Sequence, residues 1–130
     1  MTEQEIRKHF SSNRFMQECG MTIEKMGNSE DFYVKAEVLP KYFNGSSRIH
    51  GGYLYTIADT VGGVNVRRYA SKLATLDSDF HFLCNESTRY VYGYARLIRN
   101  GSKVIVMHVE VRGDSDQVFA EGTFTYYKFD

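Results

Sequence analysis

The stretch NGSSRIHGGYLYTIADTVGGVNVRRYA, residues 44–70, decides the fold because it contains the one long helix that the sequence predicts. Apolar side chains recur in it at steps of three and four residues, which is the spacing of one face of a helix. These apolar positions are Leu54, Ile57, Ala58, Val61 and Val64. The stretch therefore predicts a buried helix whose apolar face is turned toward a core.

The other face of this helix carries residues that are unusual in a helix interior. Asp59 lies there, with Tyr55 and Thr56 one turn before it and Gly62-Gly63 one turn after it. A glycine inside a helix costs about 1 kcal/mol relative to alanine. We therefore expect something to approach the helix backbone closely at Gly62 and Gly63.

The beginning of the helix has the character of an anion site. Asn44 opens a loop of cap residues, and His50-Gly51-Gly52 lies at or just inside the helix start. The first N–H groups of a helix have no partner within it, and glycine lets an oxyanion approach without meeting a Cβ. The plainer alternatives are a simple turn at the glycine pair, a capping role for His50 and a solvated carboxylate at Asp59.

A wider set of residues carries a family resemblance over roughly the last two thirds of the chain. The set comprises Asn44, His50-Gly51-Gly52, Ala58-Asp59, Gly62-Gly63, Thr75-Leu76-Asp77, Phe80, Phe82, Ala95 and Glu121-Gly122-Thr123. Together these residues resemble the hotdog-fold acyl-CoA thioesterases of the PaaI type, which are close kin of the 4-hydroxybenzoyl-CoA thioesterases. The resemblance implies sites at a subunit interface, in a homodimer or a dimer-of-dimers homotetramer.

Composition limits the possible partners. Residues 1–130 are enough for a single domain with a real core and too few for two domains. Lysine plus arginine equals aspartate plus glutamate, at 16 each, which gives no support for nucleic acid or a membrane surface as partner. The N-terminus lacks a long apolar segment, so we expect a soluble, cytoplasmic protein. Two cysteines and four scattered histidines imply neither a disulfide framework nor a metal site, and we expect no cofactor other than the CoA of the substrate.

Outside the long helix, the pattern is that of strands. A capping box from Thr2 to Glu5 predicts a short first helix that packs on the outside of the domain. Strands are expected at 21–26, 32–38, 73–83, 90–99, 103–112 and 118–129. In the third of these, Leu76, Phe80 and other apolar residues alternate with acids and His81, which predicts one buried face. Asn100-Gly101 predicts a tight hairpin.

An antiparallel sheet with one apolar face and a single long helix can bury their apolar faces against each other if the sheet curls around the helix. The pattern alone therefore predicts an α+β fold with an antiparallel sheet and a central helix. The name hotdog fold for this arrangement comes from the resemblance.

Helix geometry separates the two ends of the candidate site. Gly51 and Asp59 are eight residues apart, or about 12 Å along the axis at about 1.5 Å per residue. Both must lie about 3 Å from the reacting centre if Gly51 N–H stabilises an oxyanion and Asp59 handles the nucleophile. They must then come from different chains, and a twofold dimer with antiparallel central helices would give two equivalent sites.

Hydrolysis of an acyl-CoA thioester is the working hypothesis. Asp59 would act as general base on a water or attack the carbonyl itself. Thr75 would help to hold the water, in the position where similar thioesterases place a serine or threonine. Gly51 and Gly52 would bind the developing oxyanion. Asn44 and His50 would orient the thioester or assist the departing thiolate. Substrate contacts are expected at Gly52, Tyr55, Gly62 and Gly63, and the candidate cations for the CoA phosphates are Arg67, Arg68, Arg96, Arg99 and Lys103.

Two other functions compete with hydrolysis. A hotdog hydratase or dehydratase would need a histidine near the acid, and no histidine occupies a matching helix position beside Asp59. A catalytically silent acyl-CoA-binding module would gain little from a carboxylate beside an anionic ligand. Both rank below the thioesterase hypothesis.

Overall fold

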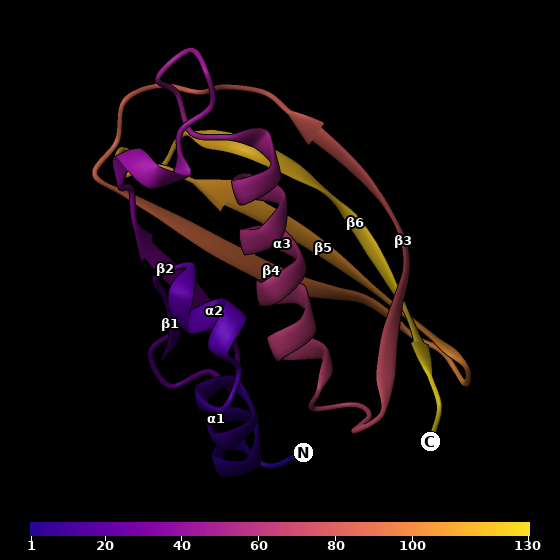
Figure 1. The fold of residues 1–130 in the computed structure, drawn as a ribbon. Helices are drawn as coiled ribbons and strands as arrows, with labels where there is room; N and C mark the ends of the chain where they lie inside the picture. The colour runs from indigo at the N-terminus through magenta and orange to yellow at the C-terminus, as the bar shows by residue number, and fades with distance from the viewer.

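The computed structural model describes residues 1–130. Its elements are α1 (Glu3–Ser11), α2 (Arg14–Glu18), β1 (Met21–Lys25), β2 (Phe32–Glu37), the short 3-10 helix η1 (Pro40–Tyr42), α3 (Gly51–Val66), β3 (Leu73–Phe82), β4 (Tyr90–Asn100), β5 (Val104–Arg112) and β6 (Val118–Lys128). The six strands form one antiparallel sheet in the order β1-β2-β4-β5-β6-β3. Helix α3 lies across one face of this curved sheet, and α1 and α2 lie beside its C-terminal half (Figure 1). The predicted α+β fold is confirmed.

The apolar stripe of α3 makes the core with the sheet. Leu54, Ile57 and Val61 are fully buried, and they face alternate buried residues of the central strands β4 and β5. Gly93 on β4 allows this close packing, because a Cβ there would lie 2.9 Å from Ile57 Cγ2. Burial of this stripe is the main source of stability for the helix, since burying one large aliphatic side chain contributes about 1.5–3 kcal/mol.

A buried amide joins α3 to β2. Asn65 is fully buried, and its Oδ1 accepts the Phe32 N–H at 2.9 Å. Its Nδ2 donates to the carbonyl oxygens of Phe32 and Val61, each at 2.9 Å. The side chain therefore satisfies backbone groups at the start of β2, which would otherwise be buried without partners.

The ends of α3 differ slightly from the predicted stretch. The helix begins at Gly51 with His50 as N-cap and ends at Val66 with Arg67 as C-cap, so residues 67–70 lie outside it. The hairpin between β4 and β5, the capping box of α1 and the strand positions are confirmed, each strand to within a residue or so. The predicted turn at Asn100-Gly101 is displaced to Ser102-Lys103, because Asn100 pairs with Ile105 and the Gly101 N–H donates to the Val104 carbonyl. Helix α2 and the short helix η1 were not predicted.

The prediction for the face of β3 was partly wrong. A β-bulge at Leu76 places an extra residue between Thr75 and Asp77, and Leu76 is 55% exposed. Phe82, also expected on the buried face, is 56% exposed. Strand β3 is at the edge of the sheet, where bulges are common and one flank of the strand has no neighbour.

The short first helix is confirmed. It packs against the domain through an apolar edge, because Ile6 and Phe10 of α1 are buried in the main core. None of the helices is long and apolar enough to cross a bilayer.

Candidate active site

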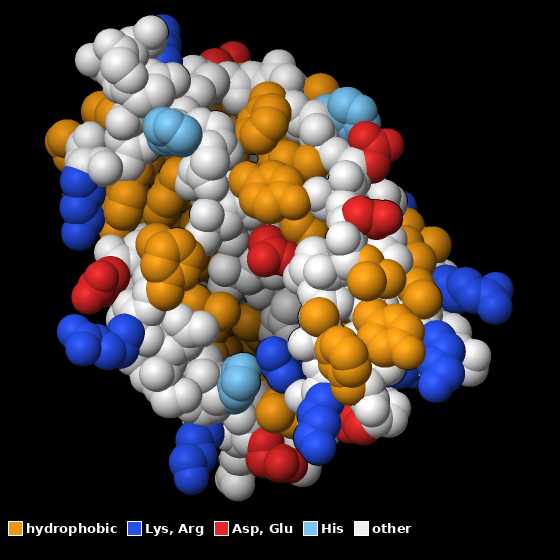
Figure 2. Space-filling view, turned by 45° about the vertical axis from the view of Figure 1, so that its right-hand side comes forward, with side chains coloured by type: hydrophobic (Ala, Val, Ile, Leu, Met, Phe, Trp, Pro, Cys, Tyr) orange, Lys and Arg blue, Asp and Glu red, His pale blue; other side chains and the backbone are white.

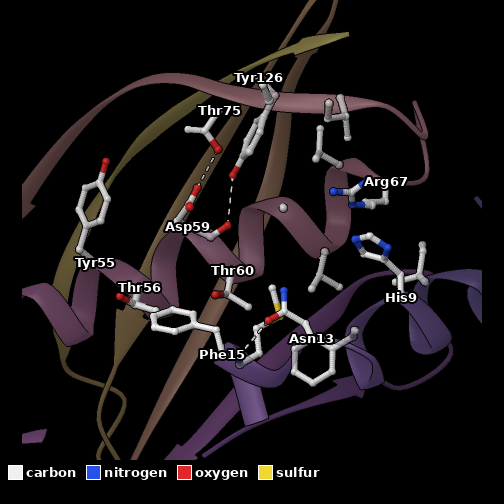
Figure 3. Close-up of a pocket in the computed structure, with 18 residues that line it drawn as sticks. His9, Asn13, Phe15, Tyr55, Thr56, Asp59, Thr60, Arg67, Thr75 and Tyr126 are labelled. Carbon is white, nitrogen blue, oxygen red and sulfur yellow. Dashed lines mark hydrogen bonds between the residues drawn. The ribbon is translucent and has the colours of Figure 1, made fainter. Parts of the chain in front are cut away.

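The carboxylate of Asp59 opens onto a cavity of about 300 Å³ between α1–α2, α3 and the start of β3. Figure 2 shows the hollow on this face, with an acidic side chain above it and a histidine and a basic side chain at its lower end. The lining residues come from α1 and α2 on one side, from α3 in the floor, and from β3 and β6 on the other side (Figure 3). Asp59 is partly buried, midway along α3, and does not point into the apolar core.

Thr75 holds the carboxylate directly. Its hydroxyl donates to Asp59 Oδ1 at 3.0 Å, and the second carboxylate oxygen has no partner in the protein (Figure 3). Burial raises the pKa of Asp59, and the hydrogen bond from Thr75 works in the opposite direction. The arrangement fixes one oxygen of the carboxylate and leaves the other free to meet a water or a ligand.

The bulge at Leu76 explains why Thr75 can reach α3. Side chains alternate along a strand, so Thr75 would ordinarily face away from Ser78. The extra residue shifts this alternation, and both side chains contact α3: Thr75 bonds Asp59, and Ser78 Oγ lies 2.5 Å from the hydroxyl of Tyr55. The bulge thus re-aims Thr75 toward the acid, a common role of bulges beside functional sites.

The N-terminus of α3 has one free donor where two were expected. His50 is the N-cap, and its Nδ1 accepts the Gly52 N–H at 2.9 Å. The Gly52 N–H is therefore occupied, whereas the Gly51 N–H donates no hydrogen bond in this chain. His50 therefore has the capping role that was the plainer alternative. The Gly51 N–H remains as the unpaired donor at the positive end of the helix.

Asn44 organises the loop that leads into α3. Its Oδ1 accepts the backbone N–H groups of Ser46 and Arg48, at 2.8 and 3.2 Å. Asn44 and Gly51 line a second cavity, of about 410 Å³, together with Phe82 and its neighbours at the end of β3. The predicted site residues therefore fall into two groups on one chain, with Asn44 and Gly51 at the helix start and Asp59 and Thr75 at the helix middle.

Of the predicted substrate contacts, Tyr55 and Gly63 line the Asp59 cavity, and Gly62 does not. Gly62 is buried against the sheet, where a Cβ would lie 2.1 Å from the hydroxyl oxygen of Tyr126 and 3.4 Å from Val109 Cγ1. The expected close approach exists at Gly62, where it is made by Tyr126 of the same chain, and nothing lies within 4 Å of a Gly63 Cβ. Gly62 therefore has a packing role within one copy of the chain, and its contact with substrate stays a prediction.

Sequence reasoning missed one wall of the cavity. Residues of α1 and α2 form it: Ile6, His9, Phe10, Asn13, Phe15 and Met16. Asn13 is the N-cap of α2, with its side chain accepting the Met16 N–H, and an asparagine before a short helix was the available signal. Arg67, which had been considered only for CoA phosphates, also lines this cavity.

The family follows from comparison with known proteins. Residues 47–120, more than half of the chain, match the family model described as the thioesterase superfamily. The chain belongs to this superfamily, and it has the hotdog fold of the PaaI proteins. Comparison with curated proteins gives no match.

Three solved structures illustrate the likeness. The Escherichia coli PaaI protein from the phenylacetic acid degradation operon has a TM-score of 0.89 at 17% identity, covering 98% of this chain and 92% of that one. A Bacillus halodurans protein solved with CoA has a TM-score of 0.73 at 26% identity, covering 81% and 70%. A Streptococcus pneumoniae TIGR4 protein, described as a hypothetical thioesterase and solved with coenzyme A, has a TM-score of 0.75 at 23% identity, covering 86% and 94%.

Proposed function

We propose that this protein hydrolyses acyl-CoA thioesters to a free acid and CoA, at sites shared between two copies of the chain. The observation that carries the proposal is the Asp59 carboxylate, fixed through one oxygen by Thr75 and open through the other to a cavity. Membership of the thioesterase superfamily supports the reaction class, and the CoA in the Bacillus and Streptococcus structures supports CoA as the thiol.

Asp59 acts on the thioester in one of two ways. As a general base, it takes a proton from a water that attacks the carbonyl carbon. As a nucleophile, it attacks that carbon itself, expels the CoA thiolate and forms an anhydride that water then hydrolyses. Both routes need Asp59 ionised, and both are compatible with its single free oxygen. Thr75 is a positioning residue in either route, because it holds the other oxygen.

The oxyanion formed at the thioester carbonyl needs a hydrogen-bond donor close to Asp59. Gly51 of the same helix cannot supply it, since Gly51 and Asp59 are about 12 Å apart along the helix axis. The unpaired Gly51 N–H of a second copy supplies it when two α3 helices lie antiparallel across a twofold axis. His50 positions that donor by capping the helix and occupying the Gly52 N–H. The free amide nitrogen of Asn44 orients the thioester beside it.

Exposed apolar side chains at the end of β3 support a second copy in this region. Phe82 and Leu83 are each more than half exposed, and Phe82 lies beside the start of α3, with a ring atom 3.4 Å from where a Gly51 Cβ would be. Exposed apolar side chains beside each other are typical of protein interfaces. The reaction needs no strong general acid to assist the departing CoA, because a thiolate is a good leaving group.

The test is release of free thiol across a panel of short, long and aryl acyl-CoAs, for the parent and Asp59→Asn. The expected loss in Asp59→Asn is about 10²- to 10⁴-fold, with the fold retained. Asp77→Asn is the matched control, because Asp77 is an exposed carboxylate on β3 with no contact to Asp59. Equal turnover by the parent and Asp59→Asn would remove Asp59 from the mechanism. Tight acyl-CoA binding without any thiol release by the parent would favour the silent binding module.

A further inference from the structure

Arg67 occupies the end of the Asp59 cavity without a carboxylate partner. Its Nη1 donates to the Ser71 carbonyl at 2.8 Å, and its other guanidinium nitrogens make no hydrogen bond in the protein. The side chain is partly buried, and it lies beside the imidazole of His9 in the cavity wall (Figure 3). The guanidinium therefore has several donors available to a ligand in the cavity.

The other arginines contrast with Arg67. One group forms ion pairs with carboxylates and comprises Arg7, Arg14, Arg68, Arg89 and Arg112. The rest are exposed to water and comprise Arg48, Arg96 and Arg99. Even Arg68, the next residue, pairs with Asp31 at 2.6 Å. Arg67 is thus the one arginine that is partly withdrawn from water and lacks an acidic partner.

The charges facing Arg67 do not compensate for this desolvation. Asp59 is the only acidic residue that lines the cavity, and it lies eight positions earlier on the helix, about 12 Å along the axis. His9 is the other titratable side chain at this end. Burial lowers the pKa of Arg67, and burial followed by the charge of Arg67 lowers that of His9. An anion bound beside Arg67 would offset the cost of desolvating this cation.

The cavity wall between Asp59 and Arg67 is mainly apolar. Val64 and Leu73 line it from α3 and β3, and Phe10 and Met16 line it from the N-terminal helices. A ligand that fits both ends and the middle has a reacting group at Asp59, an apolar chain across Val64 and an anion at Arg67. A plain alkyl acyl group matches the first two features and leaves Arg67 unpaired.

We infer that the preferred substrates are CoA thioesters of dicarboxylic acids, with the thioester at Asp59 and the distal carboxylate bound by Arg67. This inference rests on the proposed thioesterase activity and names its substrate class. Hydrolysis of such a thioester by water gives the free dicarboxylic acid and CoA. Arg67 takes no part in that reaction; it selects the acyl group.

The test compares adipoyl-CoA with hexanoyl-CoA, which have six acyl carbons each and differ in the terminal carboxylate. We expect kcat/KM to be about 10- to 100-fold higher for adipoyl-CoA, the usual worth of hydrogen bonds to a charged group. Arg67→Gln should remove this preference by lowering kcat/KM for adipoyl-CoA to about the value for hexanoyl-CoA. Arg89→Gln, at an exposed arginine that does not line the cavity, is the matched control and should keep the preference.

Calorimetric titration with free adipate and with neutral hexanamide gives a second readout that does not depend on turnover. Adipate should bind the parent and not Arg67→Gln, and hexanamide, which has no carboxylate, should bind both weakly. A parent enzyme that prefers hexanoyl-CoA would overturn the inference and leave the thioesterase proposal standing. An equal loss for both substrates in Arg67→Gln would assign Arg67 to CoA and would also overturn it. Absence of thiol release with retained Arg67-dependent adipate binding would instead refute the thioesterase activity alone.

Discussion

Adding one methyl group at Gly62 tests whether that residue is needed for packing or for substrate. In Gly62→Ala the new Cβ would lie 2.1 Å from the Tyr126 hydroxyl oxygen, far inside van der Waals contact. Overpacking of this kind costs about 1–3 kcal/mol, and the better helix propensity of alanine returns about 1 kcal/mol. We therefore expect Gly62→Ala to lower the free energy of unfolding by up to about 2 kcal/mol.

Tyr126→Phe removes the oxygen with which the methyl group collides. The nearest remaining ring atom, Cζ, is 3.2 Å from the Cβ position, which a small shift of the ring relieves. The hydroxyl itself donates only a long hydrogen bond, 3.5 Å, to the Asp59 carbonyl, so its loss alone should cost little. The double variant Gly62→Ala/Tyr126→Phe should therefore be more stable than Gly62→Ala, with a coupling of about 0.5–3 kcal/mol.

Urea unfolding of the four proteins measures this cycle, and thiol release measures its functional consequence. If Gly62 serves packing alone, the double variant should recover turnover together with stability. Additive effects on the free energy of unfolding would refute the contact between Gly62 and Tyr126. Restored stability without restored turnover would return Gly62 to the substrate site.

Three further predictions concern the acid, its partner and the buried amide. Thr75→Val removes the hydrogen bond that lowers the pKa of Asp59, so the acid limb of the kcat/KM profile should move to higher pH; an unmoved limb would contradict the role of Thr75. Burial raises the pKa of Asp59 in the folded state, so the stability that the protonated carboxyl contributes is lost as pH rises through that pKa. Asp59→Asn should abolish this pH-dependent loss, which urea unfolding across pH measures. A difference in urea midpoint between parent and Asp59→Asn that is the same at every pH would contradict the prediction. Asn65→Ala leaves the Phe32 N–H and carbonyl buried and unpaired, and should lower the free energy of unfolding by about 2–5 kcal/mol; a loss below about 1 kcal/mol would show that water replaces the amide.

Local patterns predicted most of the architecture. Residue alternation and turn residues are short-range signals, so the strands and the β4–β5 hairpin could be placed from neighbours in the sequence, the turn to within two residues. Helix α2 was not predicted because five residues are too few to show a helical period. The bulge at Leu76 was not predicted because an inserted residue disturbs the alternation from which a strand's buried face is inferred.

The candidate site could be predicted in its residues but not in its contacts. Asp59 and Thr75 were singled out separately, and their hydrogen bond depends on how an edge strand lies against α3. The partner of Gly62 is on the last strand, so only the folded chain identifies it as Tyr126. The wall from α1 and α2 and the unpaired state of Arg67 are likewise consequences of tertiary packing.

The central claim is that one copy supplies Asp59 and its neighbour supplies the Gly51 N–H. Gly51→Pro deletes this donor cleanly, because Gly51 is the first helical residue, where proline is favoured, and His50 before it has the extended backbone that proline requires. Gly51→Ala keeps the N–H and is the matched control. Gly51→Pro should lower kcat by about 10²- to 10³-fold.

Subunit mixing measures the claim most directly. Asp59→Asn and Gly51→Pro chains are each nearly inactive alone, and co-expression in equal amounts should give dimers of which about half are mixed. Each mixed dimer contains one site with both groups intact, so thiol release should recover to about 25% of the parental rate. Activity that stays at the residual level of the two variants would show that each chain holds a complete site of its own, and would contradict the shared site.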